Sequence, residues 1–159
     1  MQAHDIPMAP GAAQPDLLRL DNQLCFALYS ATLTMTKLYQ PVLKQFGITY
    51  PQYLVLLVLW KGDNLTVSDI GQRLFLDSGT LTPLLKRLEA AGLVERRRAR
   101  NDERQVRVSL SQSGRELRLK ADVIPHTVAR AAGCSVGEIA ELTRRLQLLR
   151  DSLSKSLAH

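Results

Sequence analysis

The feature that most constrains this chain is a pair of short amphipathic helix patterns followed by two strand patterns, over residues 66–110. Thr66 can cap the first helix together with Asp69, three residues further on. A short break at 75–77 separates it from a second helix, which repeats leucine at three- and four-residue spacing and stops at Gly92. Two short helices across a tight turn are typical of the helix-turn-helix motif.

Two segments with strand character follow, at 93–97 and 105–110. In the second segment Val106, Val108 and Leu110 alternate with polar residues, so they share one side of the strand. The polar residues 100–103 between the segments predict the tip of a hairpin. The sequence therefore predicts a mainly α fold with a small β-hairpin wing, in which residues 49–110 form a winged helix-turn-helix.

Residues 16–48 predict a long helix that begins near Asp16 and carries one apolar stripe, with Pro41 expected to bend or end it. Thr49 can cap the next helix, with Pro51 in its first turn, where the missing N–H costs little. This second helix reaches Trp60 and is apolar on nearly every side, so we expect it at the centre of the fold.

Residues 111–159 predict two more helices, one over 112–130 that can break at Pro125 and one over 135–157. The last helix carries apolar residues at strict three- and four-residue spacing, namely Ile139, Leu142, Leu146, Leu149 and Leu153. Such a seam needs a partner helix, which could lie within the chain or in a second subunit. Because a long N-terminal helix also flanks the small DNA-binding unit, residues 16–48 and 111–159 are predicted to form a dimerisation layer. Residues 1–15, with three prolines and a glycine, predict a disordered arm.

The positive charge is concentrated in the same central segment. The chain has a net charge of +6, and residues 86–107 hold eight Lys and Arg against four Asp and Glu. A charge run by itself is often only a solvated face, but this one lies on the second helix of the motif and on the wing. Double-stranded DNA is therefore the predicted partner.

The candidate DNA contacts differ in their expected roles. Small hydroxyls near a helix N-terminus can reach bases or phosphates, Lys86 and Arg87 would hold phosphates, and wing arginines would enter a minor groove. Pro83 lies beyond the first turn if Asp77 is the cap, so either the helix starts later or its first turn is distorted. Asp102 is either a simple turn residue or, as we expect in a wing that faces phosphates, a partner that orients a neighbouring arginine. The full set is Ser78, Thr80, Thr82, Pro83, Lys86, Arg87, Arg100, Asp102 and Arg104.

Several classes of protein are not expected. The longest apolar run, residues 53–60, is far shorter than a membrane span, and no signal peptide is expected, so we predict a cytoplasmic protein. Two cysteines are too few for a disulfide scaffold or a structural zinc site. The three histidines are scattered, and no GxSxG, Walker or HExxH pattern is present. We therefore expect no metal, no cofactor and no enzyme activity.

The two cysteines allow more than one interpretation. On one helix Tyr29 and Tyr39 lie about 40° to either side of Cys25, so all three share a face. Tyr39 is about 21 Å further along that helix, and only an antiparallel partner could bring it to Cys25. A reactive thiol and a buried cysteine among core tyrosines both remain open. Cys134, in the small-residue link 131–135, is either a thiol that moves toward a partner or a cysteine without a role.

The stretches LDSGTLTPLLKRLEAAGLVERRRARNDERQVRVSLSQSGREL and FGITYPQYLVLLVLW resemble the MarR family of winged-helix repressors, and within it the organic-hydroperoxide sensors called OhrR. Asp102 and Arg104 match the Asp-x-Arg signature of that family's wing. The resemblance covers about residues 17–157. It implies a homodimer in which Cys25 is the peroxidatic thiol, activated by Tyr29 and Tyr39. It also implies the two-cysteine type, in which Cys134 of the other subunit resolves the oxidised Cys25 as a disulfide.

The prediction is a dimeric repressor that leaves a pseudo-palindromic operator when an organic hydroperoxide oxidises it. One alternative is a repressor of the same type that is gated by a small apolar or phenolic ligand, with incidental cysteines. A second alternative, a thiol peroxidase, would leave the winged helix unexplained.

Overall fold

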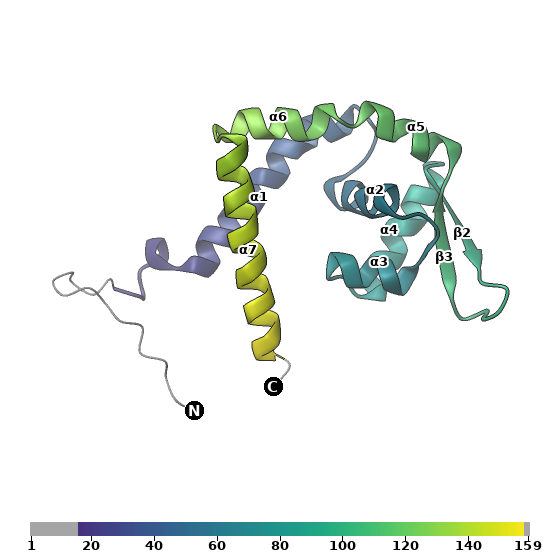
Figure 1. Cartoon of the computed structure of the whole chain (residues 1–159), viewed down its shortest axis with the longest axis horizontal. Helices are drawn as coiled ribbons and strands as arrows, with labels where there is room; N and C mark the ends of the chain where they lie inside the picture. The colour runs from purple at the N-terminus through teal and green to yellow at the C-terminus, as the bar shows by residue number, and fades with distance from the viewer. Residues whose placement is uncertain (1–15, 158–159) are drawn as a thin grey trace. The chain divides into compact units, whose positions relative to one another are not determined.

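The computed structural model describes residues 16–157, and the predicted disordered arm, residues 1–15, lies outside this range. The chain divides into two compact units, residues up to Met35 and residues from Thr36 onward, which we describe separately. Figure 1 labels the elements in chain order. They are a 3-10 turn at Leu20–Asn22, α1 (Leu24–Lys44), α2 (Tyr50–Lys61), β1 (Leu65–Thr66), α3 (Val67–Leu74), α4 (Ser78–Ala90), β2 (Val94–Arg98), β3 (Val106–Leu110), α5 (Gln112–Lys120), α6 (Val123–Ala132) and α7 (Val136–Leu157).

The long N-terminal helix differs from its prediction at both ends. It begins at Leu24 rather than near Asp16, because the 3-10 turn comes first. The expectation that Pro41 bends or ends the helix is wrong as regards its end, since α1 continues to Lys44. Pro41 lies close to the C-terminal end, where the loss of its single N–H removes only one intrahelical hydrogen bond.

The helix α2 is the centre of the second unit, as its sequence predicted. Pro51 lies in its first turn, and the N–H of Thr49 donates to Oε1 of Gln52 at 2.8 Å, which closes a capping box. Val55, Leu56 and Leu59 are at most 1% exposed and belong to one hydrophobic core shared with α3, α4 and the wing.

The helix-turn-helix is formed by α3 and α4. The Thr66 hydroxyl accepts the N–H of Asp69, and the Asp77 carboxylate accepts the N–H of Thr80, so both helices start at the predicted caps. The four leucines of α4 face the core: Leu81, Leu84, Leu85 and Leu88. Neither expected consequence of Pro83 is observed, because α4 starts directly after Asp77 and continues through Pro83. Proline is tolerated there because it costs one hydrogen bond on an exposed face.

The wing is the antiparallel pair β2–β3, with Arg96 opposite Val108. A third strand was not predicted: the two-residue β1 pairs with β3 on its other edge, which gives the order β1-β3-β2. Val108 and Leu110 are buried as the alternation predicted, and Val106 is half-buried.

Three helices follow the wing, not two. The predicted helix over 112–130 is divided at Ala121–Asp122, rather than at Pro125, into α5 and α6. Pro125 instead lies in the first turn of α6, where a proline needs no N–H partner. The helix α7 has no buried residue, and Leu142 and Leu153 of its apolar seam are 57% and 56% exposed. Within residues 16–157 no helix is long and apolar enough to cross a membrane.

Candidate nucleic-acid interface and thiol site

The outer face of α4 presents the side chains that the sequence predicted for DNA. Ser78, Thr80, Pro83, Lys86 and Arg87 are exposed, and Thr82 is half-buried. Two of the hydroxyls already donate within the helix. Thr80 Oγ1 donates to Asp77 Oδ2 at 3.1 Å, and Thr82 Oγ1 donates to the Ser78 carbonyl at 2.7 Å. Their oxygens therefore remain available mainly as acceptors for a ligand.

Part of the basic segment serves the fold rather than a ligand. Arg96 donates from Nε and Nη2 to Glu89 Oε2 at 2.9 and 2.7 Å, and these bonds hold the pKa of Glu89 below its usual range. Arg97 pairs with Glu95 at 2.8 Å, and Arg107 donates to the Asn64 carbonyl at 2.8 Å. Three of the eight cations are thus bound within the protein.

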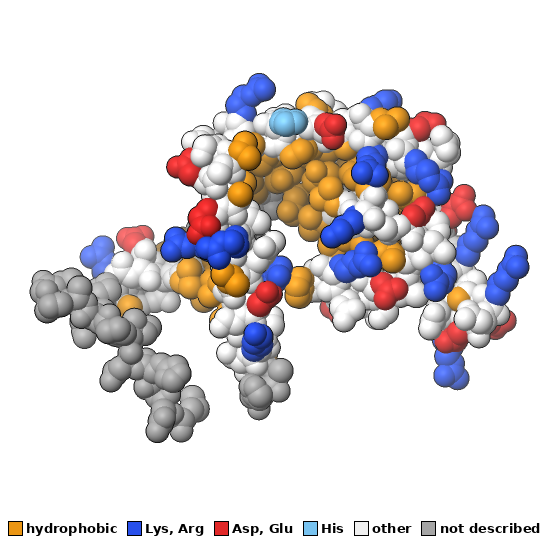
Figure 2. Space-filling model, in the orientation of Figure 1, with side chains coloured by type: hydrophobic (Ala, Val, Ile, Leu, Met, Phe, Trp, Pro, Cys, Tyr) orange, Lys and Arg blue, Asp and Glu red, His pale blue; other side chains and the backbone are white. Residues whose placement is uncertain are grey.

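The remaining cations are exposed, and within residues 16–157 their charged side-chain groups make no hydrogen bond or ion pair: Lys86, Arg87, Arg98, Arg100 and Arg104. Four of these were predicted, and Arg98 was missed. It ends the run Arg96–Arg98, in which the sequence alone does not distinguish paired from free arginines. Figure 2 shows Lys and Arg side chains around the wing, with acidic side chains among them. This cluster provides the positive surface that a phosphate backbone requires.

Asp102 shapes the wing tip through the backbone. Its Oδ1 accepts the backbone N–H of Arg104 at 3.0 Å, and its carbonyl accepts the N–H of Gln105 at 3.0 Å. Asp102 therefore acts here as a turn residue that fixes the backbone of Arg104, which is the simpler of its two interpretations. No contact of Asp102 with a guanidinium group is present within the described residues.

A hollow of about 920 Å³ lies between α3, the start of α4 and the tip end of β3. Its lining includes Ser68, Gln72, Ser78 and Arg104. The helix-turn-helix and the wing thus line one hollow that contains both polar and apolar side chains. The Thr80 hydrogen bonds hold the pKa of Asp77, at its edge, below the usual range.

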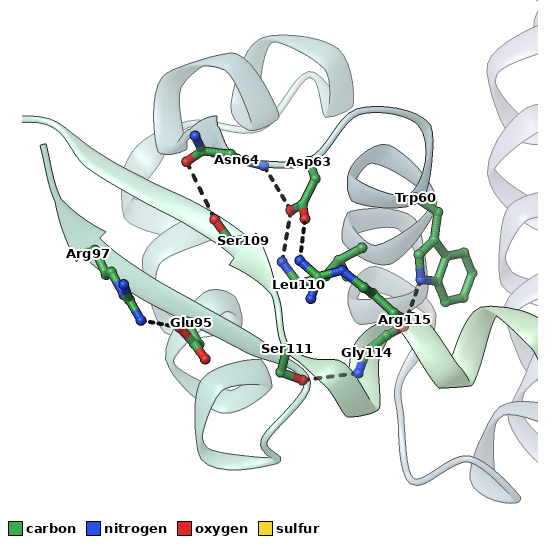
Figure 3. Close-up of polar contacts among 10 residues, drawn as sticks. All are labelled: Trp60, Asp63, Asn64, Glu95, Arg97, Ser109, Leu110, Ser111, Gly114 and Arg115. Carbon is green, nitrogen blue, oxygen red and sulfur yellow. Dashed lines mark hydrogen bonds and ion pairs between the residues drawn. The ribbon is translucent and has the colours of Figure 1, made fainter.

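Polar contacts at the base of the wing fix its direction (Figure 3). Asp63 Oδ1 accepts the N–H groups of Asn64 and Leu110, both at 2.8 Å, and its Oδ2 accepts Nη2 of Arg115 at 3.0 Å. One carboxylate therefore joins the end of α2, the end of β3 and the first turns of α5. These contacts hold the wing rigidly on the core.

Gly114 allows α5 to approach the start of the wing closely. The Trp60 Nε1–H donates to the Gly114 carbonyl at 2.9 Å (Figure 3). A Cβ atom at Gly114 would lie 2.1 Å from the Leu93 carbonyl oxygen, so only glycine fits this contact.

Cys25 lies on α1 in the unit that ends at Met35, and it is exposed with a free thiol. Within the single chain Cys25 is therefore not buried among core tyrosines. Tyr29, one turn further along, is 61% exposed. Cys134 is also exposed and free, and its Sγ lies 3.4 Å from the Ala132 carbonyl, directly after the left-handed Gly133. Tyr39 and Cys134 belong to the second unit.

Tyr39 is part of an aromatic cluster that the sequence did not reveal. Its ring centroid lies 4.7 Å from that of Tyr50 and 6.0 Å from that of Tyr53. Burial, with a contribution from the other two phenols, raises the pKa of Tyr39, so its hydroxyl remains protonated and can donate a hydrogen bond. Tyr50 is thus an additional candidate beside Tyr39. The sequence shows only that Tyr50 directly follows the Thr49 cap, and this position does not reveal its contact with Tyr39.

Within the described residues no group of three His, Cys, Asp or Glu side chains could hold a metal ion. The helix-turn-helix, the wing and the free cations together define a winged helix-turn-helix, DNA-binding transcriptional regulator. The chain belongs to the MarR family, in the branch of organic-hydroperoxide regulators that its sequence resembles. The family described as "Transcriptional regulator SarA/Rot" matches residues 37–120. This is a family of regulators and not of enzymes.

Two relatives show the same relationship over most of the chain. The organic hydroperoxide resistance transcriptional regulator of Bacillus subtilis is 47% identical, over 87% of this chain and 94% of its own length. The HTH-type transcriptional regulator TtmR of Methylorubrum extorquens is 54% identical, over 84% of this chain and 69% of its own length.

Solved structures agree with this assignment. Reduced AbfR bound to DNA is 38% identical with a TM-score of 0.69, covering 84% of this chain and 94% of that one. Disulfide-formed AbfR is 37% identical with a TM-score of 0.59, covering 88% and 93%. Apo MarR of E. coli is 25% identical with a TM-score of 0.65, covering 80% and 96%. The predicted winged-helix fold is thus confirmed.

Proposed function

We propose that this regulator is a cytoplasmic, homodimeric repressor that releases its operator when an organic hydroperoxide oxidises Cys25. The observation that carries the proposal is the exposed, free thiol of Cys25, one helical turn from the exposed phenol of Tyr29. A thiol must be accessible to react with a peroxide in solution. The similarity to a regulator of organic hydroperoxide resistance supports a role for this accessible cysteine in sensing peroxide.

The phenols supply hydrogen-bond donors to the sulfur. A phenol that donates to a thiolate stabilises the charged form and so increases the fraction that can react. Tyr29 can act from the same helix. Tyr39 is too far along α1 for that, so we assign it, together with the adjacent Tyr50, to the Cys25 of the partner subunit. The site is therefore completed by dimerisation.

The chemistry proceeds in two steps. The Cys25 thiolate attacks a peroxide oxygen, so that an S–O bond forms, the O–O bond breaks and an alcohol leaves after protonation. The sulfur becomes a sulfenic acid. The Cys134 thiolate of the partner then attacks that sulfur, the S–O bond breaks, and water leaves as the disulfide forms. The exposed Cys134 beside the left-handed Gly133 is the second thiol that this step requires.

The winged unit, residues 49–110, reads the operator. We place α4 in the major groove with Ser78, Thr80, Thr82 and Pro83 toward the bases, and Lys86 and Arg87 on phosphates. Arg100 and Arg104 enter the minor groove from a wing tip that Asp102 shapes. Residues 16–48 and 111–159 form the dimerisation layer, whose exposed α7 seam supports this assignment. Oxidation changes that layer and moves the two winged units away from the operator spacing.

The experiment uses a duplex that the reduced protein selects from a random pool. Cys25→Ser should bind this duplex with unchanged affinity and should not release it on addition of cumene hydroperoxide. Cys134→Ser should fail to give the peroxide-induced covalent dimer on non-reducing gels. Normal release by Cys25→Ser would refute the sensor, and an unchanged dimer band in Cys134→Ser would refute the pairing.

Gating by a small apolar or phenolic ligand remains the second candidate. A hollow of about 320 Å³, lined by Tyr53, Leu57, Trp60 and Arg118 among others, is the observation in its favour. In that case blocking both thiols with N-ethylmaleimide would leave release by the ligand intact.

A further inference from the structure

Phe75, in the turn between α3 and α4, has a backbone conformation that is unfavourable for a residue with a large side chain. Its φ of 57° and ψ of 37° lie in the left-handed region, where glycine is the usual residue at a helix end. The ring is also 64% exposed, so core packing does not compensate for this backbone. A strained residue that carries an exposed aromatic ring points to a role outside the core.

The partner of this ring is α7. The guanidinium carbon of Arg150 lies 4.6 Å from the Phe75 ring centroid, within the range of a cation–π contact. Asp151 fixes the guanidinium group, because Arg150 donates from Nε and Nη2 to Asp151 Oδ1 at 3.0 and 2.9 Å. From Thr36 to Leu157, no other hydrogen bond, ion pair or ring contact joins α7 to the helix-turn-helix.

The contact lies at the edge of the candidate nucleic-acid interface. Phe75 lines the hollow between α3, the start of α4 and the wing, two residues before the Asp77 cap of α4. The other end of α7 begins at Val136, two residues after Cys134. A 22-residue helix thus connects the second thiol to the turn of the helix-turn-helix.

We propose that Phe75 and Arg150 form a latch through which α7 holds the helix-turn-helix in its DNA-binding orientation. Arg150 is then a positioning residue, and Asp151 aligns it. The role of the latch rests on the proposed DNA-binding function. The contact itself can be tested without DNA.

The first test is an NMR spectrum of the reduced chain. The Nε–H proton of Arg150 is expected upfield of ordinary arginine signals, because it lies near the face of the Phe75 ring. The Phe75→Leu variant should move the signal back, and Phe75→Tyr, which keeps a ring, should preserve the shift. An Arg150 signal that Phe75→Leu leaves unchanged overturns the latch.

The second test measures affinity for the selected duplex at several salt concentrations. An exposed cation–π contact changes an equilibrium by about two- to five-fold, so two latches per dimer give a loss of about 4- to 25-fold. Phe75→Leu and Arg150→Gln should each show this loss, the double variant should lose no more, and Arg150→Lys should retain most of the affinity. The dependence of affinity on salt should not change, because the latch touches no phosphate.

Three results with the variants would contradict the positioning role. Losses that add in the double variant would show that the two residues act independently. A salt slope reduced by about one in Arg150→Gln would make Arg150 a phosphate contact instead. Unchanged affinity in both single variants would leave the contact without effect on DNA binding. A wild-type chain that binds no duplex would refute the proposed function and the latch's role, while the NMR test would still decide whether the contact exists.

Discussion

Replacing Gly114 by alanine should loosen the base of the wing. The added Cβ atom would lie 2.1 Å from the Leu93 carbonyl oxygen and 3.2 Å from Leu110 Cδ2, so the backbone must move by about 1 Å to restore contact distances. Overpacking of this kind costs about 1–3 kcal/mol. The shift also weakens the bond from Trp60 to the Gly114 carbonyl, at about 1 kcal/mol.

The gain in helix propensity, up to about 1 kcal/mol, offsets only part of this cost. We therefore expect a net loss of about 1–4 kcal/mol in the free energy of unfolding, or a fall in Tm of about 2–16 °C. The fluorescence of Trp60, the only tryptophan of the chain, reports the transition. Gly137→Ala is the matched control, because its Cβ would meet nothing within 4 Å, and it should be neutral or slightly stabilising. Equal Tm values for the two variants would refute the close-approach argument.

Three further outcomes are expected. Arg104→Ala should weaken binding to the selected duplex at least ten-fold, about 1.4 kcal/mol. Arg97→Ala should change the affinity less than three-fold, about 0.6 kcal/mol, because Arg97 is already paired with Glu95. Anisotropy titrations measure both affinities, and equal losses would contradict the division into free and paired cations. Asp63→Ala should lower the free energy of unfolding in urea by about 1–3 kcal/mol, because the half-buried N–H of Leu110 loses its acceptor. Because the pKa of Asp77 is lowered in the folded state, its ionised carboxylate stabilises the fold above about pH 4, and this stabilisation is lost as the pH falls further. Asparagine caps a helix without titrating. Asp77→Asn should therefore lose less stability than the wild type between about pH 5 and pH 3.

Local sequence signals predicted the winged unit well. The caps at Thr66 and Asp77, and the apolar residues that α4 and β3 bury, are properties of neighbouring residues and can be recognised without the rest of the chain. The strand β1 could not be predicted in this way, because two residues carry no periodicity and the strand exists only through pairing with β3. The break before α6 was likewise misplaced, since proline indicates the first turn of a helix as well as a break.

The sequence predicted which residue types form the candidate interface, but it did not predict which of them form contacts within the protein. The sequence located the basic segment, whereas only the structure separates Arg96, bound by Glu89, from the free Arg98. Tyr50 was missed for a similar reason, because its proximity to Tyr39 arises from the approach of two helices. Long-range partners of this kind depend on tertiary packing, which residue spacing does not encode.

The most direct test of the sensor follows Cys25 and the bound duplex in the same sample. One equivalent of cumene hydroperoxide is added to the reduced protein–DNA complex. Anisotropy then records release, while quenched samples give the oxidation state of Cys25 by mass spectrometry. We expect release to follow Cys25 oxidation at the same rate or more slowly, and to be absent in Cys25→Ser. Release that precedes Cys25 oxidation, or that persists in Cys25→Ser, would contradict the sensor role.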